Sequence, residues 1–203
     1  MKLLGGVLLG FLVVAVGAGV FIETGSFNVA ASSPPGKLEE TLARRALNRS
    51  VARRAPARQN PLTSSAEVLR EGRSHYRENC VGCHGAPGVD AAEYGEGLNP
   101  PAPDLTLPRV QRRPDGELHW IVANGIRMTG MPAFAPSHKE QEIWEIVAFL
   151  RHLPELSPEE ERELKSAVEA QAEHHRESPA ASAEAESGKP AHTAPPGSKP
   201  HKD

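Results

Sequence analysis

The chain has 203 residues, a formal net charge of −3 and a sequence pI near 6.3. This length fits one ordinary domain with appendages, and the lack of a basic excess argues against a nucleic-acid partner. Hydrophobic residues make up only 38% of the chain and aromatic residues 4%, so either the folded domain is small or something other than side chains fills its centre. Two cysteines are too few for a disulfide framework.

An uncharged apolar stretch runs from Leu3 to Ile22. A helix of about 20 such residues, at about 1.5 Å per residue, spans the roughly 30 Å hydrocarbon core of a bilayer. A cleaved signal peptide is the alternative, since the VAA sequence at residues 29–31 resembles a cleavage site. The apolar run exceeds the usual signal-peptide core of about 7–15 residues, so we predict a transmembrane anchor over residues 1–22. With either interpretation, we expect the rest of the chain to leave the cytoplasm.

Residues 23–63 are rich in alanine and arginine and are interrupted by four prolines. Their middle, KLEETLARRALNRSVARR, contains good helix formers but only scattered apolar positions. This pattern predicts a solvated, Arg-rich helical stalk or linker. The alternative is a basic surface for anionic lipid head groups or for an acidic partner, and the sequence leaves both open.

Residues 64–154 contain most of the apolar patterning. A first helix is expected to begin at SSAE, residues 64–67, which has capping-box spacing. One face of this helix is formed at steps of three or four by Leu69, Gly72, Tyr76 and Cys80. A glycine inside a helix costs about 1 kcal/mol relative to alanine, so Gly72 suggests that another helix approaches closely there.

Two further helices are expected in this domain. One begins near Asp115 and stops at the Asn-Gly pair at residues 124–125. The other follows Ser137, which has capping-box spacing to Glu140, and ends at Pro154. No alternating strand pattern separates these helices, so the domain is predicted to be all-α.

The last part of the chain begins with a predicted exposed helix over residues 155–177. Ser157 is a suitable cap, and Leu164 and Val168 give only a thin apolar stripe. From residue 178 to residue 203 the chain is mostly Ala, Ser, Pro, Gly and Lys. Such a composition buries too little surface to offset the entropy of ordering, so we predict a disordered tail.

Both cysteines lie in ENCVGCHG, residues 78–85. A thioredoxin-like redox pair would need a preceding strand, whereas a helix is expected here. Zinc would need more ligands, and no histidine lies at paired-ligand spacing to the cysteines. The order Cys80, Cys83, His84 is the pattern of covalent haem c attachment: two thiols of one helical turn form thioethers with the porphyrin, and the histidine binds the iron. The macrocycle would also provide the missing core.

The haem interpretation requires a second axial ligand downstream. A thioether sulfur favours Fe(II) and raises the reduction potential. Met1 is excluded by the anchor, which leaves Met128 and Met131 in RMTGMPAF. Met131 lies between a glycine that permits close backbone approach and a proline that stiffens the loop, so we expect Met131 to be the distal ligand. Met128 is then a packing residue.

Taken together, GRSHYRENCVGCHG, TGMPAF and IWEIVAFLRHLP resemble the class I (monohaem) c-type cytochromes over residues 64–154. The anchor and appendages resemble the membrane-anchored bacterial members. The resemblance implies the cytochrome c fold, with three main helices around one covalently bound haem c. It also implies that Gly72 and Tyr76 pack against an aromatic residue of the last helix, either Phe149 or Trp144.

The resemblance further implies a second-sphere contact, in which a backbone carbonyl accepts a hydrogen bond from the haem histidine. A proline-bearing loop after the haem motif provides this carbonyl in the family. Here the corresponding sequence is NPPAPDL, and it offers Pro100, Pro101 and Pro103.

An iron bound by both His84 and Met131 has no open position for substrate. This predicts a one-electron carrier rather than an enzyme, on the periplasmic face of a bacterial inner membrane. Its partners would be redox proteins such as a respiratory complex, a dehydrogenase or an oxidase. The alternatives are a haem enzyme or gas sensor with a labile methionine, where His119 or His138 would act as acid or base, and a haem-bearing subunit of a larger oxidoreductase.

Overall fold

The computed structural model describes residues 2–177 of the chain, so the predicted tail at 178–203 lies outside the described residues. Two compact units are present, divided between Ala46 and Leu47. The regular structure of the described residues is helical, apart from one isolated bridge between Ala86 and Val89. The all-α prediction is therefore confirmed.

The first unit contains the apolar helix α1, Lys2–Glu23. Within the described residues it is the one helix long and apolar enough to cross a membrane, over Leu4–Glu23. A signal sequence at the same place would have the same composition. The helix α2, Lys37–Arg54, begins in this unit and continues into the next.

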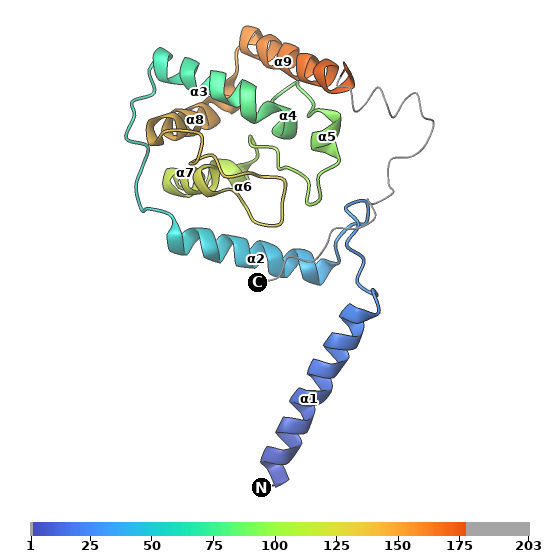
Figure 1. Ribbon diagram of the computed structural model, residues 1–203. Coiled ribbons are helices and arrows are strands. Elements are labelled where there is room, and N and C mark those ends of the chain that lie inside the picture. Colours follow the sequence, from blue (N-terminus) through green and yellow to red (C-terminus); the bar gives the residue numbers. More distant parts are fainter. Residues whose placement is uncertain (1, 178–203) are drawn as a thin grey trace. The chain divides into compact units, whose positions relative to one another are not determined.

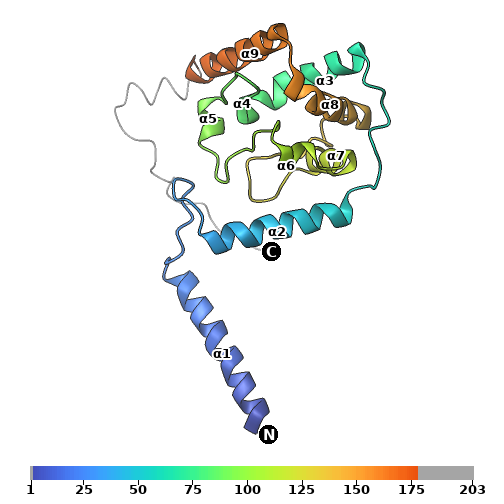
Figure 2. The same cartoon turned by 180° about the vertical axis from the view of Figure 1, so that it is seen from behind.

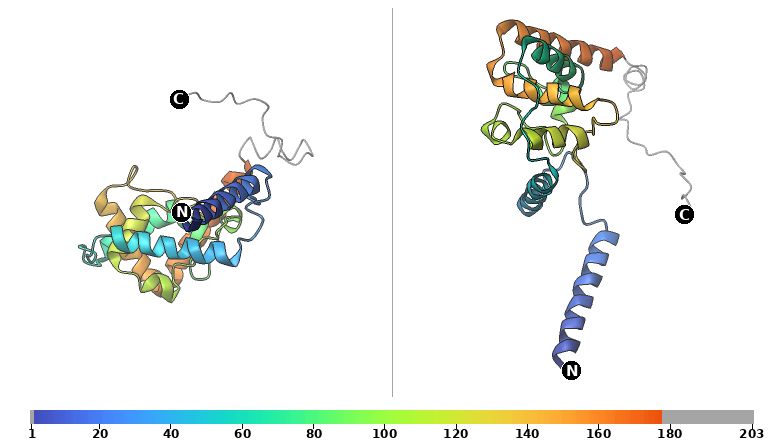
Figure 3. Two further views of the ribbon diagram at one scale, coloured as in Figure 1. Left: turned by 90° about the horizontal axis from the view of Figure 1, so that it is seen from below. Right: turned by 90° about the vertical axis from the view of Figure 1, so that its left-hand side faces the viewer.

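The second unit contains the remaining helices (Figure 1). They are α3 (Ala66–Asn79), α4 (Val81–His84), α5 (Glu93–Glu96), α6 (Pro108–Gln111), α7 (Asp115–Asn124), α8 (Glu140–His152), the 3₁₀ turn η1 (Leu153–Glu155) and α9 (Pro158–Glu177). Helix α8 lies between α3 and α7 (Figures 1 and 2), and the right-hand view of Figure 3 shows the same order.

The crossing of α3 and α8 depends on Gly72. A Cβ atom at this position would lie 2.7 Å from the carbonyl carbon of Glu145, closer still to its oxygen, and 2.9 Å from Cβ of Phe149. Tyr76, one turn later, packs against Phe149 with ring centroids 5.4 Å apart. The predicted close approach at Gly72 is confirmed, and the aromatic partner is Phe149 rather than Trp144.

Two apolar clusters form the interior of the second unit. The larger one includes Tyr76, Cys80, Val81, Phe134 and Phe149, and half-buried Met131 packs against it. The smaller one consists of Val110, Leu118, Trp144 and Val147. The cysteine motif and the methionine loop therefore border the same apolar region.

The predicted helix starts need small corrections. Helix α3 is capped by Ser65, whose Oγ accepts the Val68 N–H at 3.3 Å, and not by Ser64. Helix α8 begins at Glu140, and the Glu142 carboxylate accepts the Lys139 N–H at 2.7 Å. Ser137 instead donates to the Phe134 carbonyl.

The second main helix and its stop are as predicted. Helix α7 extends over Asp115–Asn124. Gly125 follows it with φ = +64°, a positive φ that favours glycine and ends the helix.

The expectation that the last helix is exposed is wrong for one of its faces. Helix α9 packs on α3 and α4, and its Leu164 is fully buried. Salt bridges of 3.0–3.1 Å join Glu160 and Glu163 of α9 to Arg73 and Arg77 of α3. The apolar stripe of α9 is too thin to indicate burial by itself. Leu164 is buried because α3 and α4, which are distant in sequence, cover it.

The boundary predicted between stalk and domain at residue 63 is too late. Val51 of α2 is fully buried. Asn60 is bonded to the domain at two points. Its backbone N–H donates to the Asp115 carboxylate at 2.9 Å, and its side-chain amide donates to the Trp144 carbonyl at 2.8 Å. The Arg58 guanidinium lies 4.9 Å above the Trp144 ring. Residues 47–63 therefore belong to the same folded unit as helices α3 to α9.

Candidate functional site

The two cysteines lie in a single helical turn at the junction of α3 and α4. Cys80 ends α3, and its carbonyl accepts the N–H groups of Cys83 at 3.1 Å and His84 at 2.9 Å. Gly85 then turns the chain away with φ = +59°. The buried Tyr76 hydroxyl donates to the Gly85 carbonyl at 2.5 Å, which ties the end of this turn to α3.

The two cysteines form no disulfide, and Cys80 is buried whereas Cys83 is partly exposed. Burial, together with the neighbouring Cys83, raises the pKa of Cys80 to about 12. Burial also raises the pKa of Cys83. Redox-active cysteine pairs need a lowered thiol pKa, so this environment argues against a thioredoxin-like function.

His84 is oriented by a backbone carbonyl. Its Nδ1 lies 2.9 Å from the oxygen of Pro103, which selects Pro103 among the three candidate prolines. A donating Nδ1–H leaves the lone pair of Nε2 available to a metal. Burial lowers the pKa of His84 and so favours the neutral imidazole that a metal requires.

The loop that contains Met131 is held by short-range hydrogen bonds. The Met131 N–H donates to Thr129 Oγ1 at 3.1 Å, and the Thr129 hydroxyl donates to the Ile126 carbonyl at 2.7 Å. The Ile126 N–H in turn donates to the Met131 carbonyl at 3.1 Å. A Cβ atom on Gly125 would lie 2.6–2.7 Å from the backbone of residues 131–133, so this glycine permits the loop to close.

The two candidate methionines have different environments. Met131 packs against the cluster that contains Cys80 and Val81. Met128 is 90% exposed and has φ = +60°. The structure thus brings Met131, but not Met128, to the apolar region that the cysteine motif borders.

These residues fit a covalently attached haem by the chemistry of their donor groups. Two free thiols share one turn, a neutral imidazole has one free nitrogen, and a thioether borders the same apolar cluster. A c-type haem uses this set: two thioether links and a His/Met axial pair. No group of three or more His, Cys, Asp or Glu side chains among the described residues is arranged to hold a metal ion.

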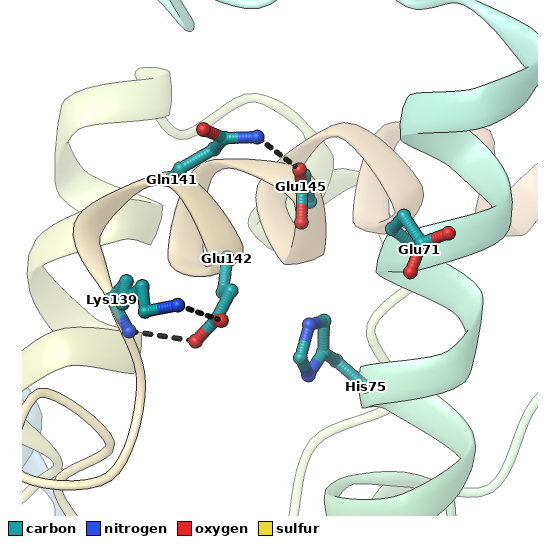
Figure 4. A pocket seen from close by; sticks show the side chains of 6 residues that line it. All are labelled: Glu71, His75, Lys139, Gln141, Glu142 and Glu145. Atoms are coloured by element: carbon teal, nitrogen blue, oxygen red, sulfur yellow. Dashed lines mark hydrogen bonds and ion pairs between the residues drawn. The ribbon is translucent and has the colours of Figure 1, made fainter.

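A separate polar pocket lies between α3 and the start of α8 (Figure 4). Its carboxylates already have partners: Glu142 accepts from Lys139, and Glu145 accepts from Gln141 at 2.9 Å. The other lining residues are Glu71 and His75. No thiol, thioether or His84 atom contributes, so this pocket is not the cofactor site.

The two histidines considered as catalytic groups have packing roles. His119 is buried and stacks on Trp144, with ring centroids 4.1 Å apart, beside the smaller cluster. The ring centroids of His138 and Phe134 are 5.3 Å apart, and the Nδ1 atom of His138 lies 2.9 Å from the hydroxyl oxygen of the adjacent Ser137. Neither position requires a role in acid–base chemistry.

A comparison with known protein families finds one match. Residues 67–150 match the family model described as cytochrome c oxidase, cbb3-type, subunit III. The matched segment contains all four candidate haem residues, Cys80, Cys83, His84 and Met131. Residues 67–150 form a c-type cytochrome domain. The domain binds one covalently attached haem c, and its activity is haem-based electron transfer. No curated protein matches the chain.

The sequence did not predict that Tyr94 and Gln171 pack against Gly82, between the two cysteines of this cytochrome domain. A Cβ atom on Gly82 would lie 2.6 Å from Gln171 Oε1 and closer still to the Tyr94 hydroxyl. Gln171 is on α9, and its Nε2 donates to the Arg77 carbonyl at 3.1 Å. The glycine between the two cysteines is the sequence signal for this close contact, but the thin apolar stripe of α9 predicts an exposed helix.

Proposed function

We propose that this protein is a membrane-tethered one-electron carrier whose haem is attached through Cys80 and Cys83 and ligated by His84 and Met131. The single observation that supports this most strongly is spatial. The cysteine turn and the Met131 loop come from segments about 50 residues apart, yet both border one apolar cluster.

The haem, when bound, supplies one-electron chemistry at its iron. The protein's own residues hold the ligands still. The Pro103 carbonyl fixes the His84 ring, and the Thr129 hydroxyl braces the backbone of Met131. The apolar cluster keeps water away from that side of the site. Ligands that do not move between oxidation states keep structural rearrangement small, which favours rapid electron exchange.

We assign the carrier to the periplasmic face of a bacterial inner membrane. The apolar helix α1 supports anchoring, and covalent haem attachment in bacteria takes place outside the cytoplasm. A tether replaces free diffusion by a high effective concentration near membrane partners.

The matched family model is that of an oxidase subunit. We therefore propose that the electron partner is a respiratory oxidase or a complex that works with one. Co-purification of such a complex with the full chain from mildly solubilised membranes tests this assignment. If the chain is recovered alone while known complexes stay intact, it acts as a separate carrier.

The ligand assignment is tested by visible spectra of the matured protein. Sulfur ligation of Fe(III) gives a weak far-red band, and Met131→Ala is expected to abolish it. Met128→Ala is the matched control and should keep the band, because its side chain is in solvent. Survival of the band in Met131→Ala, or stoichiometric CO binding by the native reduced protein, would contradict the proposal. Alkylation of both thiols in native material would contradict covalent attachment.

A further inference from the structure

One face of α2 presents leucines followed by arginines. Leu38, Leu42, Arg45, Arg49 and Arg53 follow one another at steps of four, three, four and four. At about 3.6 residues per turn these five positions lie within about a quarter of the helix circumference. All five are exposed. We call them the outer face of α2.

The opposite side of the last part of α2, residues 47–54, is fixed to the cytochrome domain. Val51 lies almost diametrically opposite Arg49 and Arg53 on the helix, and it is fully buried. Asn48, on a flank, accepts a hydrogen bond from Arg113 at 2.5 Å. Since the buried side is committed, Arg49 and Arg53 must point away from the domain.

The charges of the outer face are not neutralised within the described residues. Other arginines of this region have partners there: Arg44 binds Glu40, Arg54 donates to Ser50, and Arg58 binds Glu140. Residues 2–177 provide no salt bridge for the three arginines of the outer face. A row of three arginines without salt-bridge partners is the kind of basic segment that anionic lipid head groups attract.

We propose that the outer face of α2 binds the anionic head groups of the membrane in which α1 is anchored, and so orients the haem domain relative to the bilayer. The proposal rests on the membrane tether of the proposed function. Residues 24–36 connect the two helices, and a segment of this length reaches at most about 45 Å. The lipid surface is therefore always within reach of α2, whereas an acidic protein would have to diffuse to it.

The consequence concerns electron transfer. A tether alone leaves the domain free to rotate, so the haem edge faces a membrane partner only part of the time. Head-group binding along one helix restricts that rotation. Because Arg49 and Arg53 belong to the same folded unit as the haem motif, their orientation is transmitted to the haem.

The test uses the full, haem-containing chain in vesicles. A nitroxide is attached at Ala46→Cys, an exposed position beside the outer face, and its relaxation by a gadolinium chelate on lipid head groups is measured. With phosphatidylglycerol in the vesicles we expect strong relaxation that falls with added salt, since ion contacts with the surface are screened. The triple variant Arg45→Gln, Arg49→Gln, Arg53→Gln should weaken the bound state about fivefold per arginine, roughly a hundredfold in all.

Three controls separate the possible failures. A variant with Arg109, Arg162 and Lys165 changed to Gln has the same net charge but an intact outer face, and should behave as wild type; these three cations are exposed. Protein without Ala46→Cys should take up no label, and labelling there would show that haem attachment has failed. Release of the chain by alkaline extraction would show that the tether has failed.

Equal relaxation in phosphatidylglycerol and phosphatidylcholine vesicles overturns the proposal. So does an unchanged signal in the triple variant. If the triple variant instead slows electron transfer to a membrane complex in neutral vesicles, the outer face binds an acidic protein, and the lipid assignment is wrong.

Discussion

The substitution Gly72→Ala tests the helix crossing on which the haem domain is built. The added Cβ would lie 2.7 Å from the Glu145 carbonyl carbon and 2.9 Å from Cβ of Phe149. Carbon atoms in ordinary contact are about 3.5–4.0 Å apart, so α3 and α8 must separate by roughly 1 Å. The atoms in conflict are backbone and Cβ atoms, which cannot move out of the way by rotating a side chain.

The expected magnitude is the difference between two effects. Overpacking of this kind costs about 1–3 kcal/mol, and the better helix propensity of alanine returns about 1 kcal/mol. Because a backbone carbonyl is involved, we take the upper half of the range and expect a net loss of about 1–2 kcal/mol. For a domain of this size, that lowers the melting temperature by about 5–15 °C.

The assay is thermal unfolding of the haem protein, followed by helical circular dichroism and by the sulfur–iron band. Gly97→Ala is the matched control: its φ is −75° and the nearest atom to a Cβ there is 3.7 Å away. This control should be unchanged or more stable by about 0.4–1 kcal/mol, since alanine restricts the unfolded chain. A Gly72→Ala protein at least as stable as wild type would refute the close-packing argument.

Three other changes follow from buried or charged contacts. Tyr76→Phe leaves the Gly85 carbonyl without its buried donor, and guanidinium unfolding should show a loss of about 1–3 kcal/mol. Leu164→Ala should cost about 2–5 kcal/mol in the same assay, whereas a change within error would mean that α9 does not pack. Burial would raise the pKa of Glu160, but hydrogen bonds from Ser157 and His152 outweigh it and hold the pKa at about 2. Because the pKa of Glu160 is depressed in the folded state, its carboxylate stabilises the fold fully above the unfolded pKa of about 4.3, and this stabilisation is lost as pH falls toward 2. Glu160→Gln should therefore remove the fall in unfolding free energy between these pH values. Wild-type and variant stability profiles that run parallel over this range would contradict the argument.

The features that could be predicted from sequence are those fixed by neighbouring residues. The cysteine turn needs only one turn of helix after α3. The stop of α7 needs only a glycine that adopts φ = +64°. Gly72 was informative because a glycine inside a helix is unfavourable unless a contact requires it.

The features that escaped prediction depend on contacts between distant segments. A stripe of Leu164 and Val168 is too thin to indicate burial by itself, and Leu164 is buried because α3 and α4 provide the surface that covers it. The segment after Leu47 has few apolar residues, and it is held instead by polar contacts such as those of Asn60. Helix periodicity contains no information about such hydrogen bonds.

The loop after the haem motif shows why the proline could not be chosen in advance. Three prolines lie within four residues, and the choice depends on the path of the whole loop. Leu98, at its start, packs where a Cβ on Gly130 would lie, 2.6 Å from Leu98 Cδ2. Pro103, further along, accepts the bond from His84. One segment therefore contacts both the methionine loop and the haem histidine, so the positions of the two proposed axial ligands are set together rather than by two independent loops.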